Sequence, residues 1–93
     1  MITKIRKRDG RIVDYDITKI ENAIAKAMMA LGDGEIKDCK KMAKIVELNL
    51  MEDFEDKIPN VENIQDMVEK VLMTNGYENV AKAYILYRKD HEK

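Results

Sequence analysis

The sequence predicts a single α+β domain over residues 1–93, in which an N-terminal β-hairpin packs on a bundle of four helices. Three observations predict this fold class. Two short runs rich in β-branched residues flank an Asp-Gly pair, and four later segments carry apolar residues at helical spacing. A chain of 93 residues also leaves no room for a second hydrophobic core.

The hairpin is predicted from two runs, ITKIRKR and RIVDY, on either side of the Asp-Gly pair. Both turn residues tolerate positive φ, so this pair is a strong short-range signal for a tight turn. Alternation along the first strand places Ile5 and Lys7 on the same face. Arg8 enters the turn, and the pattern leaves the direction of its side chain open.

The first helix is predicted in ITKIENAIAKAMMAL, with Asp16 as its N-cap and a Gly-Asp-Gly sequence as its end. The expected apolar face consists of Ile17, Ile20, Ile24, Met28 and Leu31. A second helical pattern ends near Phe54, and its expected apolar face consists of Ile36, Cys39, Ala43, Val46 and Leu50.

A connection, DKIPN, precedes the third helix, and we expect an extended piece before Pro59 because proline disfavours helix in the preceding residue. Asn60 is the predicted N-cap of VENIQDMVEKVLMTNG, whose apolar face is Val61, Ile64, Val68, Val71 and Leu72. The last helix, NVAKAYILYRKDHE, is apolar around much of its circumference, which predicts a central position in the bundle.

Composition limits the classes of function. With 17 basic and 18 acidic residues, the chain as a whole has no electrostatic attraction to nucleic acid or anionic membranes. The single cysteine, Cys39, excludes an intramolecular disulfide and a cysteine-built zinc site. No apolar run approaches the length of a membrane span or forms a signal peptide, so we expect a cytoplasmic protein. The sequence holds no Ser/His/Asp or Cys/His set, and we expect no catalysis from it alone.

A basic cluster surrounds the predicted turn. Arg6, Lys7, Arg8 and Arg11 lie within six positions, and Lys19 follows one turn into the first helix. A helix N-terminus favours anions, and lysine and arginine together suit a polyphosphate. The alternative is a charged hairpin and helix surface of ordinary solvated residues, which the charge pattern taken alone favours.

Three segments, KRDGRIVDYDITKIENAI, VENIQDMVEKVL and GYENVAKAYILYR, resemble the ATP-cone family in their order and spacing, over essentially the whole chain. The most specific parts are the opening Lys-Arg-x-Gly, the Lys-Ile pair and the closing Ala-x-Ala-Tyr-Ile-x-Tyr-Arg. The resemblance implies a nucleotide-sensing module that binds ATP and dATP at one site, typically at the N-terminus of ribonucleotide reductases. There ATP keeps the enzyme active and dATP switches it off, usually by changing its oligomeric state.

The resemblance also implies roles for single residues. Lys7 and Arg8 match the family's phosphate-contacting pair, and Lys19 matches a helix lysine that also reaches the phosphates. Ile5 and Ile20 match apolar positions near the base.

Adenine recognition is implied at Val13 and Asp16, partly through backbone groups. Asp16 thus has two compatible roles, as N-cap and as acceptor for the adenine amino group. On the third helix, Val61 and Gln65 stand where family members use threonine and histidine. Gln65 can still hydrogen-bond a sugar or phosphate whereas Val61 cannot, which leaves the ATP-versus-dATP preference open. Arg88 and Lys89 are candidates for an additional phosphate contact. Together with Ile64 from the third helix, the predicted site consists of Ile5, Lys7, Arg8, Val13, Asp16, Lys19, Ile20, Val61, Ile64, Gln65, Arg88 and Lys89.

The leading hypothesis is therefore a regulatory ATP/dATP-binding domain, the allosteric activity sensor of a ribonucleotide reductase. The closing helix favours the anaerobic type. We expect the nucleotide to bind with Mg²⁺ and the partners to be reductase catalytic domains or subunits, with a nucleotide-dependent oligomer. The sequence leaves open whether the domain is excised or free-standing.

Two other hypotheses come from different classes. The ATP-cone family also occurs in a transcriptional repressor of reductase genes, where it follows a zinc ribbon. A single cysteine argues against that ribbon here. A small helical interaction or nucleic-acid-binding module is the other alternative, and its acidic helices make nucleic-acid binding the weaker expectation.

Overall fold

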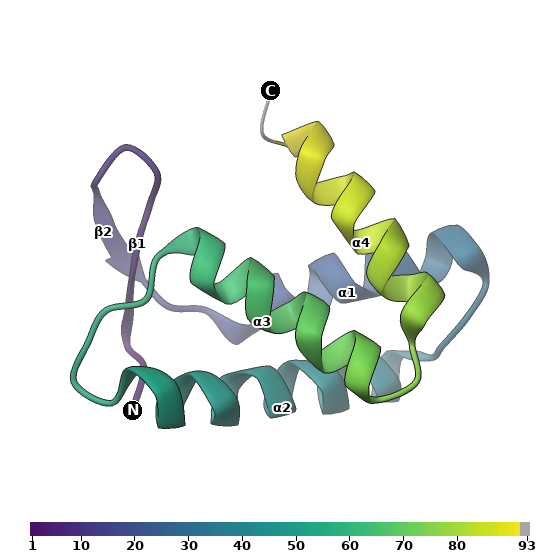
Figure 1. Cartoon of the computed structure of the whole chain (residues 1–93), viewed down its shortest axis with the longest axis horizontal. Helices are drawn as coiled ribbons and strands as arrows, with labels where there is room; N and C mark the ends of the chain where they lie inside the picture. The colour runs from purple at the N-terminus through teal and green to yellow at the C-terminus, as the bar shows by residue number, and fades with distance from the viewer. Residues whose placement is uncertain (92–93) are drawn as a thin grey trace.

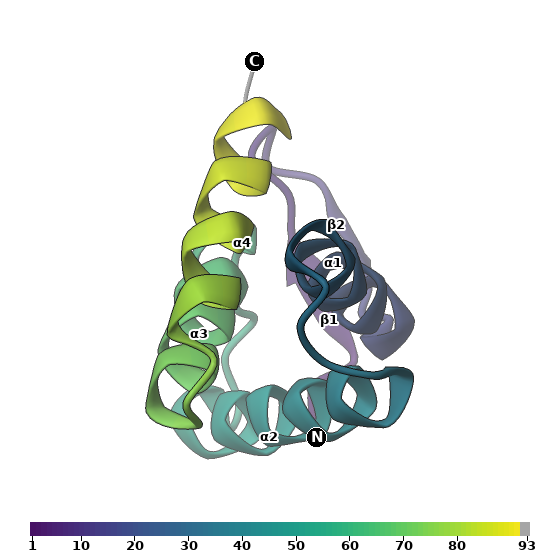
Figure 2. The same ribbon diagram turned by 90° about the vertical axis from the view of Figure 1, so that its right-hand side faces the viewer.

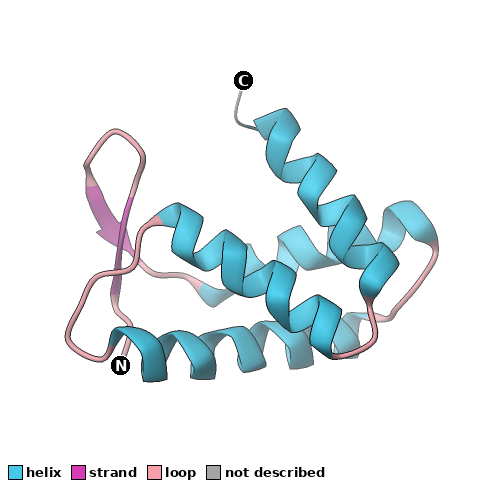
Figure 3. Ribbon diagram, viewed as in Figure 1, coloured by secondary structure: helices cyan, strands magenta, loops and turns pink. Residues whose placement is uncertain are grey.

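The computed structural model describes residues 1–91, and it confirms the predicted α+β fold of one hairpin followed by four helices (Figures 1 and 3). The elements in chain order are β1 (Lys4–Arg6), β2 (Ile12–Asp14), α1 (Ile17–Leu31), α2 (Ile36–Phe54), α3 (Val61–Thr74) and α4 (Glu78–His91).

The hairpin turn differs from the prediction. β1 and β2 pair antiparallel, but the turn is closed by a hydrogen bond from the Lys7 N–H to the Arg11 carbonyl (2.7 Å), so three residues, 8–10, form the loop. Within this loop the Gly10 N–H donates to the Lys7 carbonyl (3.0 Å). Gly10 has a φ of 90°, whereas Asp9 is not in the left-handed region. Asp9 instead accepts a hydrogen bond from the Arg11 N–H (3.0 Å). A three-residue loop with glycine in the left-handed position is the next commonest hairpin connection.

Helix boundaries follow the capping residues of the sequence. Asp16 and Asn60 have extended backbone and cap α1 and α3. The Asp16 side chain accepts a hydrogen bond from the Thr18 N–H (3.0 Å), and the Asn60 side chain accepts one from the Asn63 N–H (2.7 Å). α1 ends at Gly32, whose left-handed conformation (φ 65°) lets its N–H reach the last carbonyls of the helix.

The four helices form a closed ring (Figure 2). α1 packs against α2, α2 against α3, α3 against α4, and α4 returns to α1. The fully buried side chains inside this ring include Ile24, Met28, Val46, Leu50, Val68, Val71, Leu72 and Val80. Most predicted core positions are therefore confirmed.

Two predicted core residues are exposed instead. Leu31 is 47% exposed and Ile36 is 76% exposed, because they stand at the two helix ends that flank the loop between α1 and α2. Helical spacing predicts which face of a helix a residue occupies. It does not predict how far along that face the neighbouring helices reach.

The prediction of a central last helix was wrong. Val80, Ala81 and Tyr84 of α4 are buried, but Leu86 is 64% exposed. The C-terminal half of α4 rises away from α2, so its apolar surface is only partly covered (Figure 1). Glu92, the last residue predicted in this helix, lies outside the described residues.

A main-chain contact ties the hairpin to α3. The Arg6 N–H donates a hydrogen bond to the Pro59 carbonyl (3.0 Å), and Arg6 forms a parallel bridge with Asn60. The extended piece expected before α3 thus lies beside β1. This contact fixes the hairpin next to the first turn of α3, where the functional site is found. Among the described residues, no helix is long and apolar enough to cross a membrane.

Candidate functional site

Two cavities with shared walls open between the hairpin, α1, α3 and α4. The first, here called the tip cavity, has a volume of about 370 Å³ and is lined by Lys7, Arg8, Asp9, Val61, Gln65 and Arg88. The second, the inner cavity, has a volume of about 300 Å³. Its lining consists of Ile5, Lys7, Asp14, Tyr15, Asp16, Lys19, Ile20, Ala23, Val61, Ile64, Gln65, Val68, Tyr84, Tyr87 and Arg88. Each volume is in the range of sites for small molecules.

The two cavities differ in chemistry. The tip cavity is bordered by three cationic side chains, Lys7, Arg8 and Arg88. Apolar side chains from the hairpin, α1, α3 and α4 predominate in the inner cavity, which also holds six polar or charged side chains: Lys7, Asp14, Asp16, Lys19, Gln65 and Arg88. The combined site is therefore cationic at one end and apolar at the other.

Strand alternation brings Ile5 and Lys7 to the site together. Both side chains are half-buried, and both line the inner cavity, as expected from their shared face of β1. Lys7 also borders the tip cavity and so stands where the two cavities meet.

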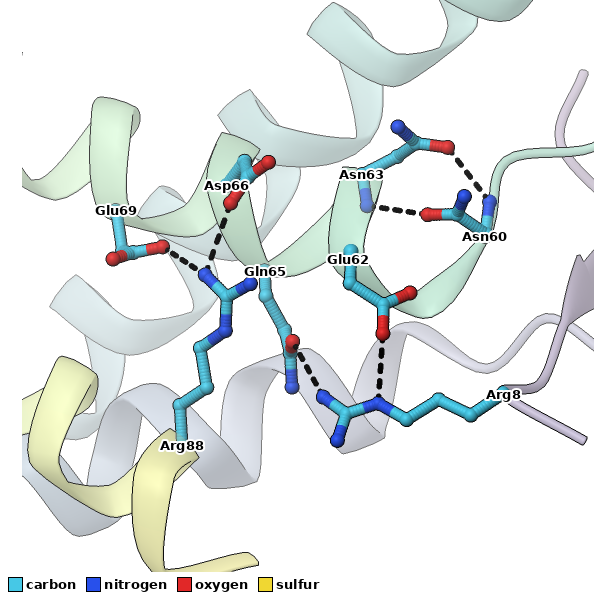
Figure 4. Close-up of polar contacts among 8 residues, drawn as sticks. All are labelled: Arg8, Asn60, Glu62, Asn63, Gln65, Asp66, Glu69 and Arg88. Atoms are coloured by element: carbon cyan, nitrogen blue, oxygen red, sulfur yellow. Dashed lines mark hydrogen bonds and ion pairs between the residues drawn. The ribbon is translucent and has the colours of Figure 1, made fainter. Parts of the chain in front are cut away.

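Arg8 leaves the turn in the direction of α3. Its Nη2 donates a hydrogen bond to Gln65 Oε1 (3.2 Å), and its Nε pairs with Glu62 Oε1 (2.8 Å) (Figure 4). Arg88 of α4 reaches the same helix, where its Nη1 pairs with Asp66 (2.9 Å) and Glu69 (2.5 Å). Two arginines from distant parts of the chain thus meet one acidic face of α3.

The start of α1 contributes two charged residues to the inner cavity, the N-cap Asp16 and Lys19. Hydrogen bonds from the Thr18 hydroxyl and N–H hold the pKa of the Asp16 carboxyl below its usual range. Asp16 is therefore ionised at neutral pH and acts as an acceptor. Lys19 lies one turn along and lines the same cavity, close to the helix N-terminus.

Tyr15 connects the inner cavity to α2. Its hydroxyl donates a hydrogen bond to Glu47 Oε2 (2.9 Å), and Lys44 pairs with the other oxygen of Glu47 (2.8 Å). Partial burial raises the pKa of Tyr15, and the neighbouring Glu47 carboxylate raises it further. The Tyr15 hydroxyl therefore stays protonated and keeps donating this hydrogen bond.

Comparison with known proteins identifies the fold. The family model described as "ATP cone domain" matches residues 3–93. This chain belongs to the ATP cone family.

Several reductases contain a region similar to this ATP cone domain. The B12-dependent ribonucleoside-diphosphate reductase of Thermoplasma acidophilum is 43% identical over 95% of this chain and 12% of its own length. The anaerobic ribonucleoside-triphosphate reductase of Haemophilus influenzae is 35% identical over 92% of this chain and 12% of its own length. The ribonucleoside-diphosphate reductase subunit alpha of Chlamydia pneumoniae is 40% identical over 94% of this chain and 9% of its own length. The chain thus spans about a tenth of each of these relatives.

Ten of the twelve residues predicted for the nucleotide site line the two cavities of the ATP cone domain: Ile5, Lys7, Arg8, Asp16, Lys19, Ile20, Val61, Ile64, Gln65 and Arg88. Val13 and Lys89 line neither cavity. Val13 pairs with Ile5 across the hairpin, and the Lys89 side chain is exposed on α4. The structure brings the ten together, and their contacts with a nucleotide stay predictions.

Other lining residues were not in the predicted site. Tyr15 and Tyr87 line the inner cavity, as does the buried Tyr84, whose ring centroid lies 6.3 Å from that of Tyr87. Tyr84 belongs both to the hydrophobic core and to the wall of the inner cavity. Tyr15 had one usable signal, because it directly precedes Asp16.

Proposed function

We propose that this ATP cone domain is the allosteric activity sensor of a ribonucleotide reductase, with ATP or dATP bound across the tip and inner cavities. The observation that carries the proposal is the polarity of the combined site. A nucleoside triphosphate has an apolar, planar base at one end and several negative charges at the other, which matches an apolar inner cavity next to a cationic tip cavity.

The polarity of the site gives the nucleotide a direction. The base lies in the inner cavity against Ile5 and Ile20, with its amino group donating to the Asp16 carboxylate. The triphosphate extends past Lys7 into the tip cavity toward Arg8. Lysine supplies a mobile charge and arginine a planar fork, and the two together suit a chain of phosphates.

Mg²⁺ in this proposal arrives with the triphosphate. Within residues 1–91, no group of three or more histidine, cysteine or acidic side chains could hold a metal ion. Phosphate oxygens and water would therefore be its main ligands, as is common for Mg²⁺ at nucleotide sites.

Regulation follows from a difference in affinity between two states of the reductase. A nucleotide in this site touches the hairpin, α1, α3 and α4 at once, so it changes the surface that these elements present to the catalytic part. ATP then favours the active state and dATP the inactive one, through a change in assembly. Anaerobic reductases are among the relatives, together with two other reductase types.

Calorimetric titration of the chain with ATP, dATP and GTP, each with Mg²⁺, tests this function. We expect adenine nucleotides to bind with micromolar dissociation constants and GTP to bind much more weakly. The reason is that guanine presents a carbonyl oxygen where adenine presents an amino donor, and an ionised Asp16 repels that oxygen. Equal binding of GTP, or no binding of any nucleotide, would contradict the proposal.

A further inference from the structure

Carboxylates on one face of α3 pair with the two arginines that border the tip cavity. Glu62, Asp66 and Glu69 are spaced so that they lie along one side of the helix. Glu62 pairs with Arg8 of the hairpin, whereas Asp66 and Glu69 both pair with Arg88 of α4 (Figure 4). Both arginines that border the tip cavity therefore pair with carboxylates of the protein itself.

The two arginines are held with different strength. Arg88 and Glu69 have side chains only 18% and 19% exposed. Separating such a pair leaves a poorly hydrated charge and is costly. Arg8 and Glu62 are 40% and 43% exposed, and an exposed ion pair contributes little. The Arg8 pair is thus the one that a ligand can exchange.

The Glu62 carboxylate also loses little stabilisation when its ion pair with Arg8 is broken. It lies in the first turn of α3, where the unpaired N–H groups of the helix N-terminus stabilise a carboxylate. Its exposure allows water to replace the guanidinium. Gln65, which also accepts a hydrogen bond from Arg8, has an amide that can accept from arginine or donate to a phosphate.

We propose that Glu62 is an internal competitor for Arg8, so that a nucleotide binds tightly only when one of its phosphates replaces the Glu62 carboxylate on that arginine. This inference rests on the proposed function and deepens it. A triphosphate that extends into the tip cavity makes the exchange. A monophosphate whose base lies in the inner cavity leaves the Arg8–Glu62 pair intact. Glu62 is then a specificity-determining residue that makes affinity depend on the number of phosphates.

Titration of the Glu62→Gln chain with ATP and AMP tests the competition. Glutamine keeps the size of the side chain and removes the charge. We expect the affinity for ATP to rise about two- to fivefold, the range that an exposed ion pair is worth, and the affinity for AMP to stay unchanged. Glu52→Gln on α2 removes the same charge outside both cavities and is expected to change neither affinity.

The same substitution in an Arg8→Ala background separates competition from simple repulsion. Because Glu62 acts through Arg8, the gain in ATP affinity is expected to disappear when Arg8 is absent. An undiminished gain in that background, an equal gain for AMP, or no gain in the first place would overturn the inference. If the unsubstituted chain binds ATP in those cases, the proposed function still stands. If neither protein binds ATP, both fail together.

Discussion

Lys7 and Arg8 are adjacent in the sequence but face different surroundings. Lys7 continues the alternation of β1 and borders both cavities, while Arg8 enters the loop and reaches Glu62 and Gln65 on α3. A strand that ends in a short loop can thus deliver two cations to one site from two directions. This placement explains why the pair, rather than either residue alone, forms the phosphate end of the proposed site.

Replacing both cations tests that role. We expect Lys7→Ala with Arg8→Ala to weaken ATP binding by at least about tenfold, since hydrogen bonds to charged groups are worth about 1.5–3 kcal/mol each. Calorimetric titration measures the change. Lys40→Ala with Lys41→Ala removes two exposed cations from α2 and serves as the matched control. Equal affinity in the two double variants would argue against the cationic end of the site.

Glu47 links the stability of the domain to pH. Hydrogen bonds from Lys44 and Tyr15 hold the pKa of its carboxyl below the ordinary value of 4.5. A carboxyl whose pKa is lowered by folding stabilises the protein above its unfolded pKa, and the contribution disappears as the pH falls through the folded pKa.

We therefore expect Glu47→Gln to lower the urea midpoint at neutral pH, and the difference from the unsubstituted chain to shrink as the pH drops below 4.5. Urea titrations at a series of pH values measure both curves. A difference that persists unchanged in strong acid would show that Glu47 contributes through packing and not through its charge.

At the scale of elements, the junction between the hairpin and α3 positions the site. Arg6 bonds to the Pro59 carbonyl, and the next residue, Asn60, is both the bridge partner of Arg6 and the N-cap of α3. The Asn60 and Asn63 side chains each accept a hydrogen bond from the other residue's N–H. The first turn of α3 and the hairpin are therefore held as one unit.

Removal of this cap has an expected cost. Asn60→Ala is expected to lower the free energy of unfolding by about 1 kcal/mol, the usual value of an N-cap side chain. Asn22→Ala, at an exposed position inside α1, is expected to cause no loss because alanine is the better helix former. Denaturant unfolding of both variants checks the contrast, and equal losses would contradict the capping role.

Local signals predicted the elements better than they predicted their contacts. Asp16 and Asn60 mark helix starts because a cap needs only residues two or three positions away. The turn was predicted as a hairpin but with the wrong geometry, since Asp-Gly also fits a three-residue loop with positive φ at glycine alone. The contact between Arg8 and Gln65 joins residues 57 positions apart, and no local pattern indicates it.

At the scale of the whole molecule, the packing of the four-helix ring holds the elements that line the site in position. The core side chains inside the ring come from all four helices, and the two cavities lie where the hairpin meets α1, α3 and α4. A domain of this size buries a limited core and has a small margin of stability. The geometry of the site therefore depends on intact packing.

Leu72 tests that dependence because it is fully buried in α3. Leu72→Ala is expected to lower the free energy of unfolding by about 2–5 kcal/mol, as for other large-to-small core changes. Met73→Ala, the adjacent residue at 55% exposure, is expected to change it little. Thermal or urea unfolding measures both. Similar small losses would mean that this part of α3 is less tightly packed than the structure shows.

The composition of the site was predicted in large part from the sequence, because the resemblance supplied positions that spacing alone could not connect. Gln65 and Arg88 were joined to Lys7 in that way, and all three line the cavities. Glu62 was not predicted, since an acidic residue in the first turn of a helix has an ordinary role at that position. Its pairing with Arg8 became visible only once the hairpin and α3 were placed together.

The central claim is that an adenine nucleotide binds between the hairpin, α1, α3 and α4. The most direct test is a map of backbone amide chemical shifts in the ¹⁵N-labelled chain during titration with ATP and Mg²⁺. The largest changes are predicted in residues 5–11, 15–23, 61–68 and 84–88, which surround the two cavities. Largest changes elsewhere, for example in residues 52–57 at the acidic end of α2, would contradict this location of the site.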